Sequence, residues 1–219
     1  MKREVIFIFP NTHRIIANEL YNEIYRVYNI KLDKKSLIWG SQLPDYSPKH
    51  KMIPHYYDKS IDYIVGEIIS LIVLARFTNL EESSYIGVTK KIFSKKLGII
   101  SHYLTDYVTL AHYENWSFKD SMVKHVSYER KLNHIAENFD FTRNEVINLR
   151  IDLDDIFSLR KNIRNNIDEV LKLYRKEKSL ERDLTFAYNI NLNIIYFVID
   201  IINVYSNNLS TAKLGLLAR

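Results

Sequence analysis

The sequence contains no cysteine and has few residues that interrupt regular secondary structure. Without thiols, neither a disulfide framework nor a thiolate-held metal site can form, so any zinc ion must be held by histidine and carboxylate side chains. Only 5 glycines and 4 prolines occur in 219 residues, which leaves little room for a turn-rich β fold and favours long helices. We therefore expect an all-α protein, and the length suits a single domain that spans residues 1–219.

The chain also lacks a recognisable secretory signal and a clean transmembrane segment. The apolar run VIFIF at residues 5–9 is too short for a signal peptide, and Pro10 ends it without a small-residue cleavage site. The two longest apolar stretches, residues 64–77 and 190–205, each contain an acidic residue and fall short of a membrane span. We expect both to be buried core helices of a soluble protein located in the cytoplasm.

Positive charge is in mild excess, with a net charge of +5 and a pI near 9.1. A basic protein can favour anionic membrane surfaces or nucleic acid. Here the charges are scattered as they are on solvated helix faces. The densest basic group, KKIFSKK at residues 90–96, interleaves with apolar residues as an amphipathic helix does. The charge alone therefore assigns no partner.

Capping residues and breakers divide the chain into five to seven main helices. A helix is expected from Asn11 to about Asn29, and residues 31–58, which hold three of the prolines, are expected to form a short helix and then a structured loop. Two further helices are expected from Asp58 or Ser60 to about Asn79 and from Ser83 or Ser84 through SHYLTDYVTL. A capping box of Ser117 and Asp120 starts the next helix, and one of Thr142 and Glu145 starts a short segment. Two long helices are expected over residues 152–177 and 180–206.

The strongest functional signal is an ordered series of histidines and carboxylates. Its members are His13, Asp45, His55, His102, Asp106, His112, His125 and Glu129. The series contains two i,i+4 pairs, His102 with Asp106 and His125 with Glu129, and on a helix such side chains share one face and can hold one ion between them. Imidazole with carboxylate and no sulfur favours zinc at a catalytic site, although manganese and iron accept the same ligand types.

Salt bridges are the alternative explanation for these pairs. A carboxylate such as Asp106, on the buried side of an apolar helix, is costly unless it is paired or bound to metal. An ion pair would explain either i,i+4 pair, but it explains both of them together with the other histidines poorly. Two histidines fall outside the series. His50 competes with His55, which we favour because its neighbours are not lysines, and His134 is expected on a solvated helix face.

Five segments in order carry a resemblance to a known family. THRIIA, WGSQLPDY, PHYYD, LGIISHYLTDYVTLAHYENW and KHVSYE resemble the zinc-dependent phospholipase C family, which includes bacterial phospholipases C and the catalytic domain of clostridial alpha-toxin. The family shares its helical fold with S1/P1-type nucleases. The resemblance spans roughly residues 11–130, and SHYLTD-x5-H followed by H-x3-E is its most specific part. It implies one multi-helix domain of the phospholipase C and P1 nuclease type.

The resemblance also implies a distribution of zinc ligands. One zinc would be held by Asp45, His55, His102 and Asp106; another would be held by His112, His125 and Glu129. His13 would share a further zinc with the amino terminus, towards which Asp106 would bridge. Family members present a processed tryptophan there, whereas this chain has Met1, twelve residues before His13. We therefore expect two zinc sites to form, and the site of His13 to be weak or empty.

The implied activity is zinc-dependent phosphodiester hydrolysis. A phospholipase C-like enzyme would cleave phospholipid between glycerol and phosphate through a zinc-activated water, with Asp45 as the general base. Such an enzyme would make peripheral contact with a membrane. Aromatic candidates for a pocket wall that accepts a choline-like cation are Tyr56, Tyr57, Tyr103 and Trp116. The alternatives are a nuclease or small-molecule phosphatase on the same fold, with nucleic acid as a partner only for the nuclease, and a non-catalytic metal-binding helical protein.

Overall fold

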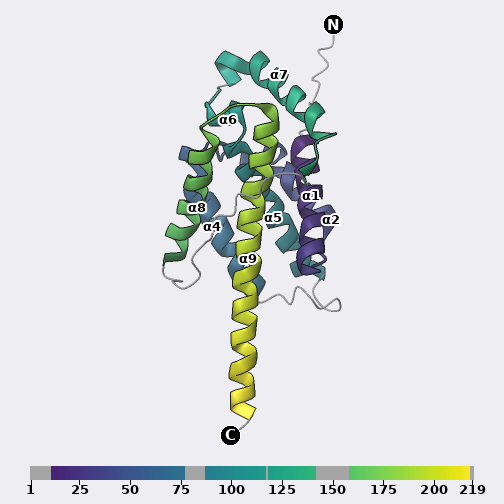
Figure 1. Cartoon of the computed structure of the whole chain (residues 1–219), viewed down its shortest axis with the longest axis vertical. Helices are drawn as coiled ribbons and strands as arrows, with labels where there is room; N and C mark the ends of the chain where they lie inside the picture. The colour runs from purple at the N-terminus through teal and green to yellow at the C-terminus, as the bar shows by residue number, and fades with distance from the viewer. Residues whose placement is uncertain (1–10, 77–86, 117, 142–157, 218–219) are drawn as a thin grey trace.

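The structure, a computed structural model, describes residues 11–76, 87–116, 118–141 and 158–217. These ranges contain nine helices and no strand (Figure 1), which confirms the all-α expectation. The helices are α1 (Asn11–Tyr28), α2 (Lys34–Tyr46), α3 (Pro48–Lys51), α4 (Tyr57–Arg76), α5 (Gly87–Tyr107), α6 (Leu110–Tyr113), α7 (Phe118–Ala136), α8 (Leu159–Tyr174) and α9 (Leu180–Leu217). Because α3 and α6 have only four residues each, seven longer helices form the body, as predicted.

Helix α5 lies at the centre of the body and packs against α1, α2, α4 and α9. Figure 1 shows it behind α9, with α4 on one side and α1 and α2 on the other. Every residue of the stretch 97–107 is buried, so this half of α5 has no solvent-facing side. His102 and Asp106 belong to that stretch, and their polar groups must therefore find partners inside the protein.

Two glycines allow α2 and α5 to approach closely. A Cβ atom on Gly40 would lie 2.2 Å from the carbonyl oxygen of Lys95, and one on Gly98 would lie 2.2 Å from that of Leu37. Only hydrogen fits in these positions, so the two backbones can touch. The close packing brings the last turn of α2, which contains Asp45, to the level of His102 on α5.

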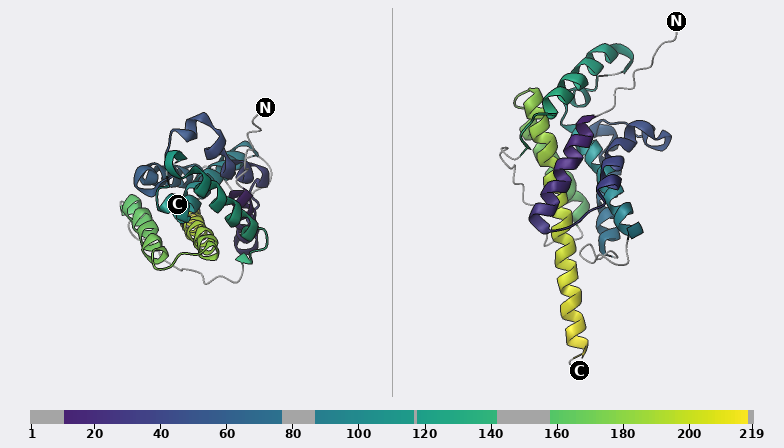
Figure 2. Two further views of the ribbon diagram at one scale, coloured as in Figure 1. Left: turned by 90° about the horizontal axis from the view of Figure 1, so that it is seen from above. Right: turned by 90° about the vertical axis from the view of Figure 1, so that its right-hand side faces the viewer.

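Helix α9 is the longest element and runs past the end of the body. Figures 1 and 2 show its carboxyl end projecting beyond the other helices, and it continues past the predicted end at residue 206. Within the described residues, Leu180–Asn203 is the one helical stretch long and apolar enough to cross a membrane. Since 83% of its most apolar window is buried, the stretch packs as a core helix does.

Several predicted boundaries hold and others need correction. Helix α1 ends one residue before Asn29, which takes the left-handed conformation (φ 54°) typical of the residue that terminates a helix. Helix α2 includes Pro44, so Asp45 lies in its last turn and not in the expected loop. Helix α4 begins at Tyr57, and neither Asp58 nor Ser60 is its cap.

Other predicted boundaries lie outside the described residues. These are the end near Asn79, the starts at Ser83 or Ser84 and at residue 152, the cap at Ser117, and the Thr142–Glu145 box.

Candidate metal centre

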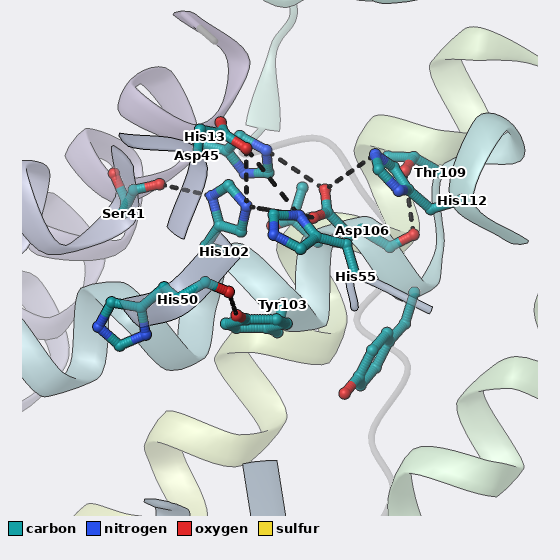
Figure 3. Close-up of polar contacts among 12 residues, drawn as sticks. His13, Ser41, Asp45, His50, His55, His102, Tyr103, Asp106, Thr109 and His112 are labelled. Carbon is teal, nitrogen blue, oxygen red and sulfur yellow. Dashed lines mark hydrogen bonds and ion pairs between the residues drawn. The ribbon is translucent and has the colours of Figure 1, made fainter. Parts of the chain in front are cut away.

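The eight predicted ligands meet at the end of α5, although they come from five helices and one loop. Their atoms form three groups in which every ligand atom lies within 4.8 Å of the others in its group. The groups are His13, His102 and Asp106; Asp45, His55 and His102; and His112, His125 and Glu129. Figure 3 shows most of these side chains pointing toward one another around Asp106. Each group has the residue types that zinc prefers when no thiolate is present.

Asp106 connects the three groups. Its Oδ2 atom lies 2.8 Å from His55 Nδ1 and 3.2 Å from His102 Nε2, and its Oδ1 atom lies 3.3 Å from His13 Nε2 and 3.7 Å from His112 Nε2. Burial would raise the pKa of Asp106, but the neighbouring histidines, led by His112 and His102, hold that pKa well below its ordinary value. The carboxylate is therefore ionised, and it can bridge two cations.

A main-chain contact fixes the orientation of His102. Its Nδ1 atom lies 2.8 Å from the carbonyl oxygen of Ser41 on α2. A carbonyl oxygen only accepts hydrogen bonds, so Nδ1 carries the proton and Nε2 faces the carboxylates. Burial would lower the pKa of His102, but the charges of Asp106 and Asp45 outweigh it and raise that pKa to about 9. A cation bound at Nε2 would take the place of the second proton.

The group around Asp45 has separations that suit zinc ligands. His55 Nδ1 and His102 Nε2 lie 2.8 to 3.9 Å from Asp45 Oδ1 and Asp106 Oδ2. Zinc bonds of about 2.0–2.1 Å place tetrahedral ligand atoms roughly 3.3 Å apart. The two ring nitrogens face each other at 3.2 Å, a distance that needs a proton or a cation between them. Asp45, His55 and His102 therefore offer the ligands of one zinc ion, and Asp106 lies next to both histidines.

The group of His112, His125 and Glu129 lies between α6 and α7. His125 Nε2 is 2.9 Å from Glu129 Oε1, and His112 Nε2 is 4.0 Å from the same oxygen. Burial lowers the pKa of His112 to about 4, so its ring is neutral at pH 7, as a metal ligand must be. Burial would also lower the pKa of His125, but the hydrogen bond and charge of Glu129 outweigh it and raise that pKa.

His13 has fewer partners of its own. Its ring stacks on the His102 ring with centroids 3.9 Å apart, and its Nε2 atom faces Asp106. The Nε2 atom of His102 also serves the group around Asp45, so among the described residues His13 has only Asp106 as a second ligand. A complete site here needs a further donor. Met1, the predicted one, lies outside the described residues.

A cavity of about 100 Å³ adjoins the centre. Four of the candidate ligands line it: His13, Asp106, His112 and Glu129. The remaining wall comes from α1, the end of α5 and α7. It includes Arg130, which is exposed and carries a positive charge. A small anionic group could therefore reach the ligands from this side.

The four predicted aromatic wall residues have different surroundings. Tyr103 is fully buried and donates to the carbonyl oxygen of His50, which corrects the expectation that its ring faces a substrate. Tyr56 is half-buried beside the His112 ring, at 6.1 Å between centroids. Tyr57 and His112 share a separate cavity of about 210 Å³. Trp116 lines a third cavity, where the Lys124 ammonium already lies over its ring, 3.6 Å from the centroid.

The two histidines outside the series stay away from the centre. The structure brings His55 to the cluster, whereas His50 is buried elsewhere and contacts Tyr103 through its carbonyl oxygen. His134 is exposed on α7, as predicted. The contact from Ser41 to His102 was missed at the sequence level, because a main-chain carbonyl has no residue-type signal.

A model of the family described as zinc dependent phospholipase C matches residues 12–181. The match covers well over half of the chain, and the protein therefore belongs to the zinc-dependent phospholipase C family. The match confirms the resemblance and extends it about fifty residues beyond residue 130. No curated protein and no solved structure matches the chain. Family and ligand chemistry together support zinc as the cofactor.

Proposed function

We propose that the protein is a phospholipase C-like hydrolase that cleaves phospholipid between glycerol and phosphate. The observation that carries this proposal is the position of Asp106, a buried and ionised carboxylate with candidate zinc ligands on both of its oxygens. We assign one zinc to the group around Asp45 and one to the group of His112, His125 and Glu129. The site of His13 is a third that depends on a donor from outside the described residues.

The carboxylates of Asp45 and Asp106 have different roles in this proposal. Bound zinc supplies positive charge for the phosphate oxygens and lowers the pKa of a water ligand to about 7. The side chain of Asp45 is 34% exposed and that of Asp106 only 3%, so Asp45 is the carboxylate that water and substrate can reach. We assign Asp45 as the general base that orients the attacking water and accepts its proton.

The cavity beside the centre supports an anionic substrate. Arg130 follows Glu129 directly in α7 and lines the same wall, so its guanidinium can approach a phosphate bound at the zinc ligands. The family implies a phospholipid as that phosphate ester. Peripheral contact with a membrane is part of the proposal, because the substrate resides in a bilayer. The cytoplasmic location stays a prediction.

A substrate comparison tests the proposed reaction. Zinc-loaded protein is incubated with mixed phospholipid vesicles and, separately, with single-stranded RNA and a soluble phosphate monoester. We expect release of diacylglycerol and phosphorylated headgroups from the vesicles, with at least a hundredfold loss for Asp45→Asn and no loss for His134→Ala. Release of nucleotides or inorganic phosphate without diacylglycerol would identify the nuclease or phosphatase alternative. No product from any substrate would identify a non-catalytic metal-binding protein.

A further inference from the structure

A second buried carboxylate lies outside the metal centre, in the first turn of α9. The side chain of Asp183 is enclosed, with the residue 1% exposed, and it accepts hydrogen bonds from three neutral donors. These are the hydroxyl of Tyr128, the hydroxyl of Tyr174 at 2.6 Å and the backbone N–H of Leu110 at 3.5 Å. An unpaired buried carboxylate is costly, and the three donors offset that cost.

Two of these donors belong to the elements that carry a ligand group. Leu110 is the first residue of α6, two positions before His112. Tyr128 lies on α7, three positions after His125 and one before Glu129. The Tyr128 hydroxyl also accepts a hydrogen bond from the Leu110 N–H at 2.9 Å. Asp183 and Tyr128 therefore tie the start of α6 to α7 next to all three candidate ligands.

The ligand geometry needs such a tie. Helix α6 has only four residues, and a helix of one turn does not hold itself in place. His112 reaches Glu129 across the gap between α6 and α7, and their facing atoms are 4.0 Å apart. A small shift of α6 would separate them beyond the reach of one ion. The third donor, Tyr174 at the end of α8, holds the carboxylate itself in place.

We infer that Asp183 is a positioning residue for the group of His112, His125 and Glu129, acting through Tyr128 and Leu110. The inference rests on the proposed binding of zinc by this group. Asp183 contacts none of the three ligands directly and lies two residues beyond the end of the family match at residue 181. Residues that orient metal ligands through hydrogen bonds are typically worth about 10–100-fold in metal affinity.

Zinc titration of the metal-free protein tests the role of Asp183. Asparagine keeps the shape of Asp183, but its NH2 group replaces one of the two oxygens that accept a hydrogen bond from a tyrosine hydroxyl. We expect one zinc ion to bind about 10–100-fold more weakly in competition with a chromophoric chelator, while the other keeps its affinity. Tyr128→Phe removes both the donor to Asp183 and the acceptor for Leu110, and it should weaken the binding of the same zinc ion. This variant decides the question if Asp183→Asn does not fold.

Asp200→Asn is the matched control. Asp200 lies on the same helix and also accepts a hydrogen bond from a tyrosine, Tyr28 at 3.1 Å. The Asp200→Asn substitution should leave every zinc affinity unchanged. Unchanged zinc affinities in folded Asp183→Asn and Tyr128→Phe, whatever their melting temperatures, would overturn the inference. Failure of the wild-type protein to bind a second zinc would overturn it together with the assigned site. Full zinc binding without hydrolysis would refute the proposed reaction and leave the inference standing.

Discussion

At the scale of single residues, His102 is the ligand most enclosed by the protein. Its side chain is fully buried, its Nδ1 is held by Ser41, and its Nε2 faces Asp45 and Asp106. We predict that His102→Ala removes bound zinc and lowers hydrolysis by more than about 100-fold, because even residues that only orient ligands contribute 10–100-fold. Metal analysis and the vesicle assay measure both. His134→Ala, on the exposed face of α7, should change neither, and a loss there would mean that the site is misplaced.

The protonation of His102 predicts how zinc uptake depends on pH. With its pKa near 9, this side chain is charged at pH 7, so a zinc ion must displace a proton there. We expect zinc affinity to rise from pH 6.5 to about 9, with proton release on binding. Calorimetric titration in two buffers of different ionisation enthalpy measures the released protons. Affinity that does not change across this range would contradict the ionisation assigned to His102.

The candidate ligands were visible in the sequence to different degrees. The i,i+4 spacing places His102 beside Asp106 whatever the tertiary fold, so those pairs could be predicted locally. The meeting of His13 and Asp45 with them depends on packing between distant segments, and it was expected only through the family resemblance. Tyr103 was misjudged because a tyrosine next to a ligand histidine points to a different side of the helix, here into the core.

At the scale of elements, the contact between α2 and α5 positions the ligands of both helices. A methyl group on Gly40 or Gly98 would meet backbone atoms, which cannot rotate away. We predict that Gly40→Ala and Gly98→Ala each destabilise the fold by about 1–3 kcal/mol or more and weaken zinc binding, because the helices must move apart. Denaturant unfolding and zinc titration measure the two effects.

Gly66 offers a control for these substitutions. It lies in the middle of α4, and a Cβ atom there would meet nothing within 4 Å. Gly66→Ala should stabilise the protein by roughly 0.5–1 kcal/mol, as glycine is a poor helix former. Equal effects of all three alanines would contradict the close approach of α2 and α5.

Asp183 gives α9 a pH-dependent stability. Burial raises its pKa from 3.8 to about 6, although the tyrosine hydrogen bonds oppose the rise. The folded state therefore binds this proton more tightly than the unfolded state does, and stability is lost as the pH rises through about 6. The difference corresponds to roughly 3 kcal/mol. Metal-free wild type should lose that much more stability than Asp183→Asn between pH 4 and pH 7 in urea unfolding, and parallel curves would refute the assignment.

The helices themselves were largely predictable, and the exceptions have physical reasons. The helix start at Asn11 and the apolar run from residue 190 predicted α1 and the existence of α9, although α9 continues from the predicted end at residue 206 to Leu217. Pro44 favours a helix end because proline lacks an N–H and its ring crowds the carbonyl four residues back, yet α2 continues for two residues beyond it. That single difference moved Asp45 from the predicted loop onto a rigid helix.

At the scale of the whole molecule, the centre joins elements that are distant in sequence. Ligands from α1, α2, α5, α6 and α7 surround Asp106, so bound zinc would link most of the described body. A ligand that binds only the folded state stabilises it in proportion to the logarithm of its concentration above Kd. Zinc should therefore raise the melting temperature, and a chelator should lower it.

The metal content of the purified protein tests the central claim most directly. The protein is prepared without chelator, and zinc is counted per chain by elemental mass spectrometry. We predict two or more zinc ions per chain, because two complete ligand groups lie around Asp106. Less than one metal ion per chain would contradict a multinuclear zinc centre.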